Sequence, residues 1–236
     1  MFDQIGLIFS TLVRGLPVTI AATLGGIALT VVLSFVAGLA LLAPSRTVRF
    51  LSRVYVEGFR GTSEMVQLFW IYFVLPVLVG FELVPLFAGI LVLGLNHGAY
   101  GAEIVRGAVQ SVPKAQYEGA IALSLSPAQR MLRVILPQAV VEMLPSFNNL
   151  FIQLLKSTAL LYFISAEELT ERGQLLAPSL PIAQLVPIYV IELLFYLLLA
   201  VLITVGMRAL ERVGARRLGR RAPRRRSTPP VTAGGV

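Results

Sequence analysis

Apolar stretches free of charged residues decide what this chain can fold into. One of them, residues 16–43, contains no Asp, Glu, Lys or Arg and ends immediately before Pro44. A helix of about 20 apolar residues spans the hydrocarbon core of a bilayer, and several stretches reach that length. Charged residues make up only 14% of the chain and the mean hydropathy is +0.81. We therefore predict an all-α integral membrane protein rather than one or two soluble domains.

The apolar stretches predict five transmembrane helices and a simple domain plan. They cover residues 16–43, 65–81, 86–110, 138–163 and 183–207. An N-terminal segment, residues 1–15, precedes a transmembrane domain of residues 16–208, which contains a half-polar segment at residues 111–137. Residues 209–236 form a basic tail, and its Ser, Thr, Pro and Gly content predicts disorder.

Lys and Arg are distributed unevenly among the connections. The 44–60 connection, the half-polar segment and the tail are basic, whereas the connections around Glu82 and Glu167 are poor in basic residues. Positive residues stay on the cytoplasmic side of a membrane. The pattern places the N-terminus outside and the C-terminus inside. It also explains the arginine-rich tail as a topology signal rather than as a nucleic-acid site.

The half-polar segment has a definite internal plan. Residues 114–125 predict one short helix. Ser126-Pro127-Ala128-Gln129 fits a capping box and predicts a second helix that ends before Pro137. Such a helical pair fits three roles: a helix lying on lipid, an ordinary loop, or a knob that docks into a soluble partner.

The same segment resembles the EAA motif of permease subunits in bacterial ABC importers: Glu-Ala-Ala, three residues, Gly, nine residues, Ile-x-Leu-Pro. Here the motif reads Glu118-Gly119-Ala120, then Ser124, and it ends at Pro137 with the spacing kept. The departures are Gly119 and Ser124, which are still small residues. The resemblance implies a cytoplasmic coupling helix in a cleft of an ATPase. Glu118 would be a polar contact or cap, and Gly119, Ala120 and Ser124 a close-packing surface. We call residues 111–137 the coupling segment.

Other stretches resemble the polar amino-acid uptake branch of these permeases, in consistent order along residues 15–172. They are GLPVT (15–19), YVEGFRGT (55–62), YGAEIVRG (100–107) and LKST (155–158). The branch has five spans per subunit and resides in the bacterial inner membrane. QLFWIYFVLP (67–76) and LGLNHGAYGAE (93–103) look most like ectoine and hydroxyectoine permeases, with a polar amino acid as the alternative solute.

The chain itself has no apparent means of hydrolysing ATP. Lys156-Ser157-Thr158 lacks the glycines that precede a phosphate-binding Gly-Lys-Ser/Thr sequence. With no cysteine and one histidine, we predict neither a metal site nor a cofactor, and no enzymatic activity. The resemblance implies a cytoplasmic ABC ATPase dimer that binds ATP and Mg, and an extracytoplasmic solute-binding protein. Because transporters commonly hold the solute between two related halves, we also predict a second permease subunit, identical or related.

Polar residues inside the predicted spans are candidates for the solute pathway, because burying them in a membrane is costly. Lys156 has no acid nearby in sequence, and Asn149 and Gln153 share its helix face. We predict that these three contact the solute, with Lys156 at a carboxylate. Snorkelling of Lys156, or pairing with Glu142 or Glu192, is the alternative.

One further residue and two charged pairs, inside or beside the spans, fit a structural role. His97 fits either the pathway or a packed, hydrogen-bonded position. Glu103 and Arg106 lie one turn apart and predict a structural ion pair. Glu57 and Arg60 predict a structural pair on the cytoplasmic side.

Two other functions fit the same composition. An ion-coupled secondary transporter of amino-acid-like solutes would use Glu103 or Glu142 and would need no ATPase. A membrane scaffold would transport nothing, which the polar face of residues 149–156 argues against. ATP dependence of uptake separates these functions.

Overall fold

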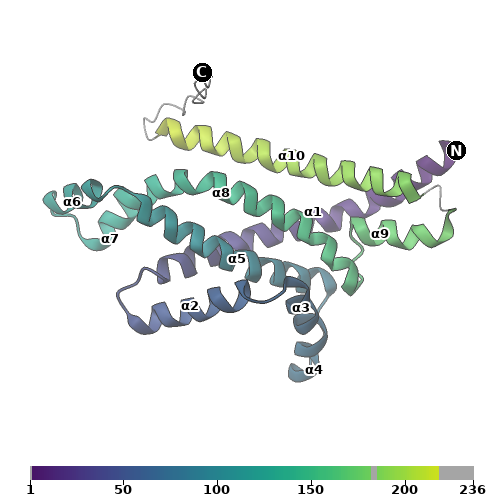
Figure 1. The fold of residues 1–236 in the computed structure, drawn as a ribbon, viewed down its shortest axis with the longest axis horizontal. Helices are drawn as coiled ribbons and strands as arrows, with labels where there is room; N and C mark the ends of the chain where they lie inside the picture. Colours follow the sequence, from purple (N-terminus) through teal and green to yellow (C-terminus); the bar gives the residue numbers. More distant parts are fainter. Residues whose placement is uncertain (1, 182–184, 218–236) are drawn as a thin grey trace, which may run out of the picture.

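The computed structural model describes residues 2–181 and 185–217, and within them the regular structure is entirely helical (Figure 1). The α-helices are α1 (Phe2–Ala40), α2 (Arg46–Arg60), α3 (Glu64–Phe69), α4 (Leu75–Val79), α5 (Pro85–Ser111), α6 (Lys114–Ala122), α7 (Pro127–Arg130), α8 (Leu136–Ser157), α9 (Leu169–Leu176) and α10 (Leu185–Arg217). Two π-helical segments, η1 (Trp70–Val74) and η2 (Met131–Ile135), and two 3₁₀ segments, η3 (Thr158–Ile164) and η4 (Ala177–Ser179), connect them.

Length and composition support fewer membrane spans than the sequence predicts. In the described residues, Ile5–Ala40 and Leu185–Arg216 are each long and apolar enough to cross a bilayer. Two bent pairs raise the number to four if each counts as one span: Arg46–Arg60 with Glu64–Val79, bent by 104°, and Pro127–Ile164 with Leu169–Ser179, bent by 48°. The central helix α5 is not among them, because Asn96 and His97 interrupt its apolar run.

Helix α5 lies at the centre and packs closely along α1 (Figure 1). Small residues make this approach possible. A Cβ atom at Gly38 would lie 2.6 Å from the carbonyl oxygen of Ala102, and one at Gly101 would collide with the Ser34 hydroxyl. Helices that lack a strong hydrophobic drive in lipid associate through such close backbone contacts.

Apolar clusters join the remaining long helices to this pair. Val105 of α5, Ile135 of η2 and Phe147 of α8 belong to one cluster, which Met207 of α10 also enters. A second cluster joins α1, α9 and α10 through Leu12, Leu169 and Ile188. The bundle thus has α5 in its interior, with α10 outermost on α8.

Several boundaries differ from the sequence-based ones for physical reasons. Helix α1 begins at Phe2 and continues through Pro17, so residues 2–15 are continuous with the helix of the first predicted span. The basic 44–60 connection contains the helix α2, with charged residues on one side and Val56 buried on the other. Helix α10 extends to Arg217, so residues 209–217 of the predicted tail are helical; residues 218–236 lie outside the described part of the chain.

The helix that begins at Pro127 does not end before Pro137. It widens into the π-helical η2 and continues as α8, with Pro137 in the first turn. The same arrangement occurs at η1, which precedes Pro76. Proline lacks the N–H that an α-helix needs, and a local π turn lets the helix continue past it.

Candidate functional site

The coupling segment lies at one end of the bundle, opposite the N-terminus (Figure 1). Its first helix, α6, is anchored to the end of α5, because the Tyr117 hydroxyl donates to the Val109 carbonyl at 3.1 Å. Burial raises the pKa of the Tyr117 phenol, so the hydroxyl stays protonated and remains a donor. Gln138 Nε2 donates to Gln116 Oε1 at 3.3 Å and ties α6 to the start of α8.

The bend between α6 and α7 depends on a left-handed residue. Ser124 has φ of 56°. The Leu125 N–H bonds to the Ala120 carbonyl at 3.1 Å, and the Ser124 N–H bonds to the Ile121 carbonyl at 2.8 Å. This is the hydrogen-bond pattern of a Schellman motif, in which glycine is the preferred left-handed residue. Ser124 therefore fixes the bend through its backbone.

The predicted capping box at α7 is confirmed. Gln129 N–H donates to Ser126 Oγ at 3.3 Å, and Ser126 N–H donates to Gln129 Oε1 at 3.0 Å. The start of α7 and the bend are thus held by bonds within the segment itself.

The motif residues differ in how much surface they offer. Glu118, Gly119, Ser124 and Pro137 are exposed, whereas Ala120 is buried and packs within the chain. A Cβ atom at Gly119 would meet nothing within 4 Å. Large apolar side chains are exposed beside them: Ile121 at 57% and Leu123 at 75%. The segment presents a small, partly apolar surface that the other described residues leave uncovered.

On α8, Asn149, Gln153 and Lys156 all lie on one exposed face, which we call the α8 stripe. Lys156 forms no ion pair with any described residue. Glu192, one of the partners considered for it, accepts instead from Thr170 Oγ1 at 2.7 Å.

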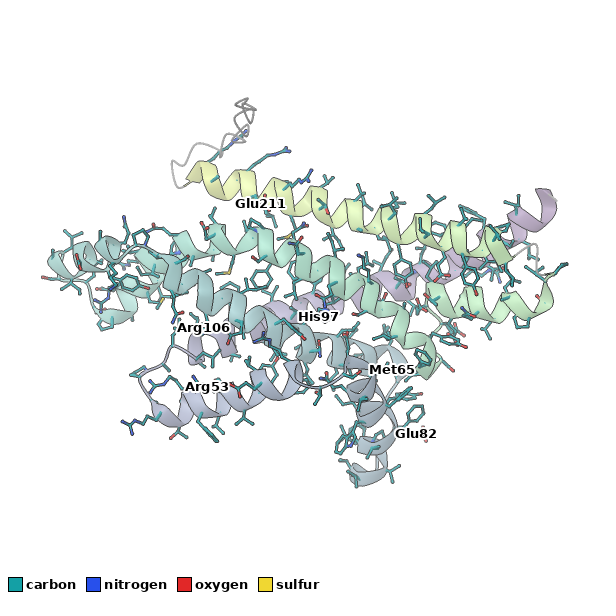
Figure 2. All side chains as sticks on the ribbon, viewed as in Figure 1. Arg53, Met65, Glu82, His97, Arg106 and Glu211 are labelled. Carbon is teal, nitrogen blue, oxygen red and sulfur yellow. The ribbon has the colours of Figure 1, made fainter. Side chains whose placement is uncertain are left out.

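His97 does not reach this face, because its side chain is fully buried in the bundle (Figure 2). Its Nδ1 lies 3.1 Å from the Leu93 carbonyl oxygen and 3.4 Å from Oε1 of Glu64. Ser157 Oγ donates to the other carboxylate oxygen of Glu64 at 2.9 Å. The carboxylate therefore joins α3, α5 and the end of α8.

The side-chain amides of Gln67 and Asn96 extend this network of polar contacts toward the bend between α2 and α3. Gln67 Nε2 donates to the Phe59 carbonyl at 2.8 Å and to Thr62 Oγ1 at 2.7 Å. Asn96 Nδ2 donates to Gln67 Oε1 at 3.0 Å. We call Glu64, Gln67, Asn96, His97 and Ser157 the polar cluster.

Sequence reasoning did not assign Glu64, Gln67 or Ser157 to a site. Glu64 stands just before the predicted second span, where an acidic residue looks like an ordinary boundary. One sequence feature could have linked Glu64 to a site: it lies three residues before Gln67, so the two polar side chains share a helix face.

A second charged region lies between α2 and α5, around a pocket of about 370 Å³. Arg106 Nη2 contacts Glu103 Oε2 at 2.6 Å. Glu57 contacts Arg53 at 3.7 Å, not Arg60 as predicted; Arg60 instead lies 5.2 Å from the centre of the Tyr100 ring. Figure 2 shows Arg53 and Arg106 in the same half of the molecule. In the described residues, no three His, Cys, Asp or Glu side chains are grouped as a metal site requires.

Comparison with known proteins agrees with this arrangement. Residues 2–213 match the family described as binding-protein-dependent transport system inner membrane component. The chain is 44% identical over 203 residues to the probable amino-acid ABC transporter permease protein y4tF of Sinorhizobium fredii, covering 84% of each chain. It is 36% identical over 187 residues to the L-cystine transport system permease protein TcyL of Bacillus subtilis, covering 75% of this chain and 77% of the relative. A crystal structure of an amino acid ABC transporter with histidines superposes with a TM-score of 0.80 at 27% identity, covering 90% of this chain and 98% of the other.

Proposed function

The chain belongs to the family of binding-protein-dependent transport system inner membrane components, and we propose that it forms the solute path of an ATP-driven importer. It is a multi-pass inner-membrane permease subunit, as its amino-acid ABC transporter relatives are. The solute would be small and zwitterionic. The observation that carries the proposal is the coupling segment, a self-supported surface that nothing else in the described chain covers.

A five-span topology with the N-terminus outside is part of this proposal. Helix α6, helix α7 and the C-terminal end of α10 lie in the half of the molecule opposite the N-terminus (Figure 1). The coupling segment as a whole and the end of α10 are basic, and a single cytoplasmic side for them satisfies the positive-inside rule. Helix α5 would then be the third span, shielded from lipid by α1 and α8.

The coupling segment would dock into one subunit of a cytoplasmic ABC ATPase dimer, which binds ATP and Mg. Ile121 and Leu123 are exposed at the end that faces the cytoplasm in this topology, where no lipid covers them. Gly119 would allow close approach of the ATPase, and Glu118 would supply a polar contact. An exposed apolar patch with polar neighbours is typical of a protein interface.

The α8 stripe would line the solute path at a contact with a second permease subunit, identical or related. Asn149, Gln153 and Lys156 are polar, exposed and arranged along one face, which is costly toward lipid and favourable toward a water-filled path. An extracytoplasmic solute-binding protein would deliver the solute to this path.

Two solute classes follow from the resemblances. Relatives named for L-cystine and glutamine transport support a polar amino acid. The stretches at residues 67–76 and 93–103 support ectoine or hydroxyectoine. All of these carry a carboxylate beside a cationic nitrogen, so the mechanism is the same for each.

Uptake of labelled solutes tests the proposal. The chain is reconstituted with its ATPase, second subunit and binding protein, and labelled ectoine, glutamine and cystine are offered with and without ATP. We expect ATP-dependent uptake of one of them, insensitive to ionophores. Ionophore-sensitive uptake without ATP would instead support an ion-coupled secondary transporter.

A further inference from the structure

We infer that Glu64 binds the cationic nitrogen of the transported zwitterion, opposite Lys156, which takes its carboxylate. The inference rests on the proposed function and adds the residue that recognises the cation. It starts from three contacts in the polar cluster: Ser157 Oγ to Glu64 Oε2 at 2.9 Å, His97 Nδ1 to Glu64 Oε1 at 3.4 Å, and His97 Nδ1 to the Leu93 carbonyl at 3.1 Å.

The contacts of His97 determine whether its ring is neutral or charged beside Glu64. A backbone carbonyl only accepts hydrogen bonds, so Nδ1 carries the hydrogen that faces Leu93. The other ring nitrogen, Nε2, is buried and has no partner. A charged imidazolium needs an acceptor for each of its two N–H groups, and a neutral ring with hydrogen on Nδ1 needs only one. His97 is therefore neutral and donates its hydrogen to Leu93, so it lies beside the Glu64 carboxylate without neutralising it.

Glu64 has no Lys or Arg within ion-pair distance among the described residues. Its Oε1 atom is buried and accepts no hydrogen bond. An unbalanced carboxylate in a membrane protein is costly, and such groups mark sites for ions or charged solutes. With 18% of its side chain exposed, Glu64 is the reachable member of the pair, since His97 is at 0%.

Lys156 supplies the opposite charge at the same level of the bundle. It directly precedes Ser157, the residue that bonds to Glu64, and its own side chain is exposed and unpaired within the described chain. Glu64 and Lys156 form no ion pair with each other, so the two charges do not cancel. A solute that carries both charges close together would satisfy both, whereas an anion would leave Glu64 unpaired and a neutral sugar would leave both residues unpaired.

Equilibrium binding to the purified permease–ATPase complex, without binding protein, tests the inference. Labelled glutamine, cystine and ectoine are each compared with a compound that keeps the carboxylate and lacks the cation. These compounds are N-acetylglutamine, N,N′-diacetylcystine and cyclohexanecarboxylic acid. The wild-type complex should prefer the zwitterion in the pair that it accepts.

In Glu64→Gln, affinity for the zwitterion should fall by roughly tenfold to a hundredfold, the range for losing a charged hydrogen bond. Affinity for the cation-free compound should stay unchanged, so the preference collapses. The Gln side-chain oxygen still accepts from Ser157, which preserves the fold. Lys156→Gln should weaken both compounds equally, and Glu82→Gln, a carboxylate exposed in the α4–α5 connection, should weaken neither.

An unchanged preference in Glu64→Gln, or equal weakening of both compounds, overturns the inference. So does a wild-type complex that shows no preference within any pair. If ATP-dependent uptake persists in the wild type in those cases, the proposed function stands and only the role of Glu64 fails. If the wild type takes up none of the three zwitterions, the proposed function fails with it.

Discussion

The coupling segment and the polar cluster differ in how they are held together and in how much of their surface is exposed. The bend and the second helix of the coupling segment are held by bonds between neighbours in sequence, such as the reciprocal pair of Ser126 and Gln129, and the segment leaves its surface uncovered by other described residues. The polar cluster is held by bonds between distant helices and is mostly buried, as in the Ser157–Glu64 bond that spans 93 residues. A surface meant for a partner has to be stable before the partner arrives, whereas a buried carboxylate depends on the packing of the whole bundle.

The strongest test of this contrast is Gly119→Leu. Apart from the adjoining backbone of its own helix, no described atom lies within 4 Å of the added Cβ, so the permease should fold normally. An ATPase surface packed closely on Gly119 would clash, at a cost of about 1–3 kcal/mol. We expect solute transport per ATP hydrolysed to fall by roughly tenfold or more.

Gly206→Leu is the matched control, because a Cβ there also meets nothing within 4 Å and the position lies on α10. Transport by this variant should match the wild type. Equal losses in both variants, or in neither, would contradict docking at Gly119.

Gln67→Leu tests the buried region, where the loss should appear in stability. The substitution removes bonds to the Phe59 carbonyl, to Thr62 and to Asn96, and one hydrogen of the buried Asn96 amide loses its acceptor while the other keeps the Phe59 carbonyl. Leaving a buried donor unpaired costs about 1–3 kcal/mol. Thermal unfolding of the detergent-purified permease should show a clear decrease in midpoint.

The control is Gln153→Leu, on the exposed α8 stripe, where no hydrogen bond is lost within the described chain. Its midpoint should stay near that of the wild type. A smaller decrease for Gln67→Leu than for Gln153→Leu would show that the polar cluster does not hold the helices together.

Ser126→Ala should have a local effect of about 1 kcal/mol, the usual cost of losing an N-cap. The Gln129 N–H loses its acceptor and α7 should fray. Hydrogen exchange at the amides of Gln129 and Arg130 reports this directly. Ser111→Ala is the control, since Ser111 Oγ bonds back to the Ala108 carbonyl and caps no helix start. Comparable fraying of α7 in both variants would rule out the capping box as its cause.

The same contrast explains what the sequence could predict. The capping box and the limits of α5 follow from patterns within a few residues, and they were predicted closely. The five-span count was not confirmed, because α5 has Asn96 and His97 within its apolar run and two other candidate spans are bent by 104° and 48°, which hydropathy does not encode. The contact of Glu64 with His97 and Ser157 depends on how three helices pack, and no local pattern specifies it.

Ser124→Gly should give the smallest effect, a gain in local stability. Ser124 is left-handed at φ 56°, which costs a non-glycine residue about 1–2 kcal/mol, whereas glycine loses about 0.5–1 kcal/mol more backbone entropy on folding. The net gain should be about 0.5 kcal/mol, visible as slower exchange of the Leu125 amide that bonds to the Ala120 carbonyl.

Ser165→Gly is the companion variant, because Ser165 has φ of 53° at the end of η3, outside the coupling segment. It should slow exchange around Ala166, whose amide bonds to the Leu161 carbonyl, and leave Leu125 unchanged. Faster exchange at Leu125 in Ser124→Gly would mean that the hydroxyl, not the backbone, holds the bend. In that case Ser124, which stands where the EAA motif has glycine, would stabilise the bend through its hydroxyl rather than through its backbone conformation.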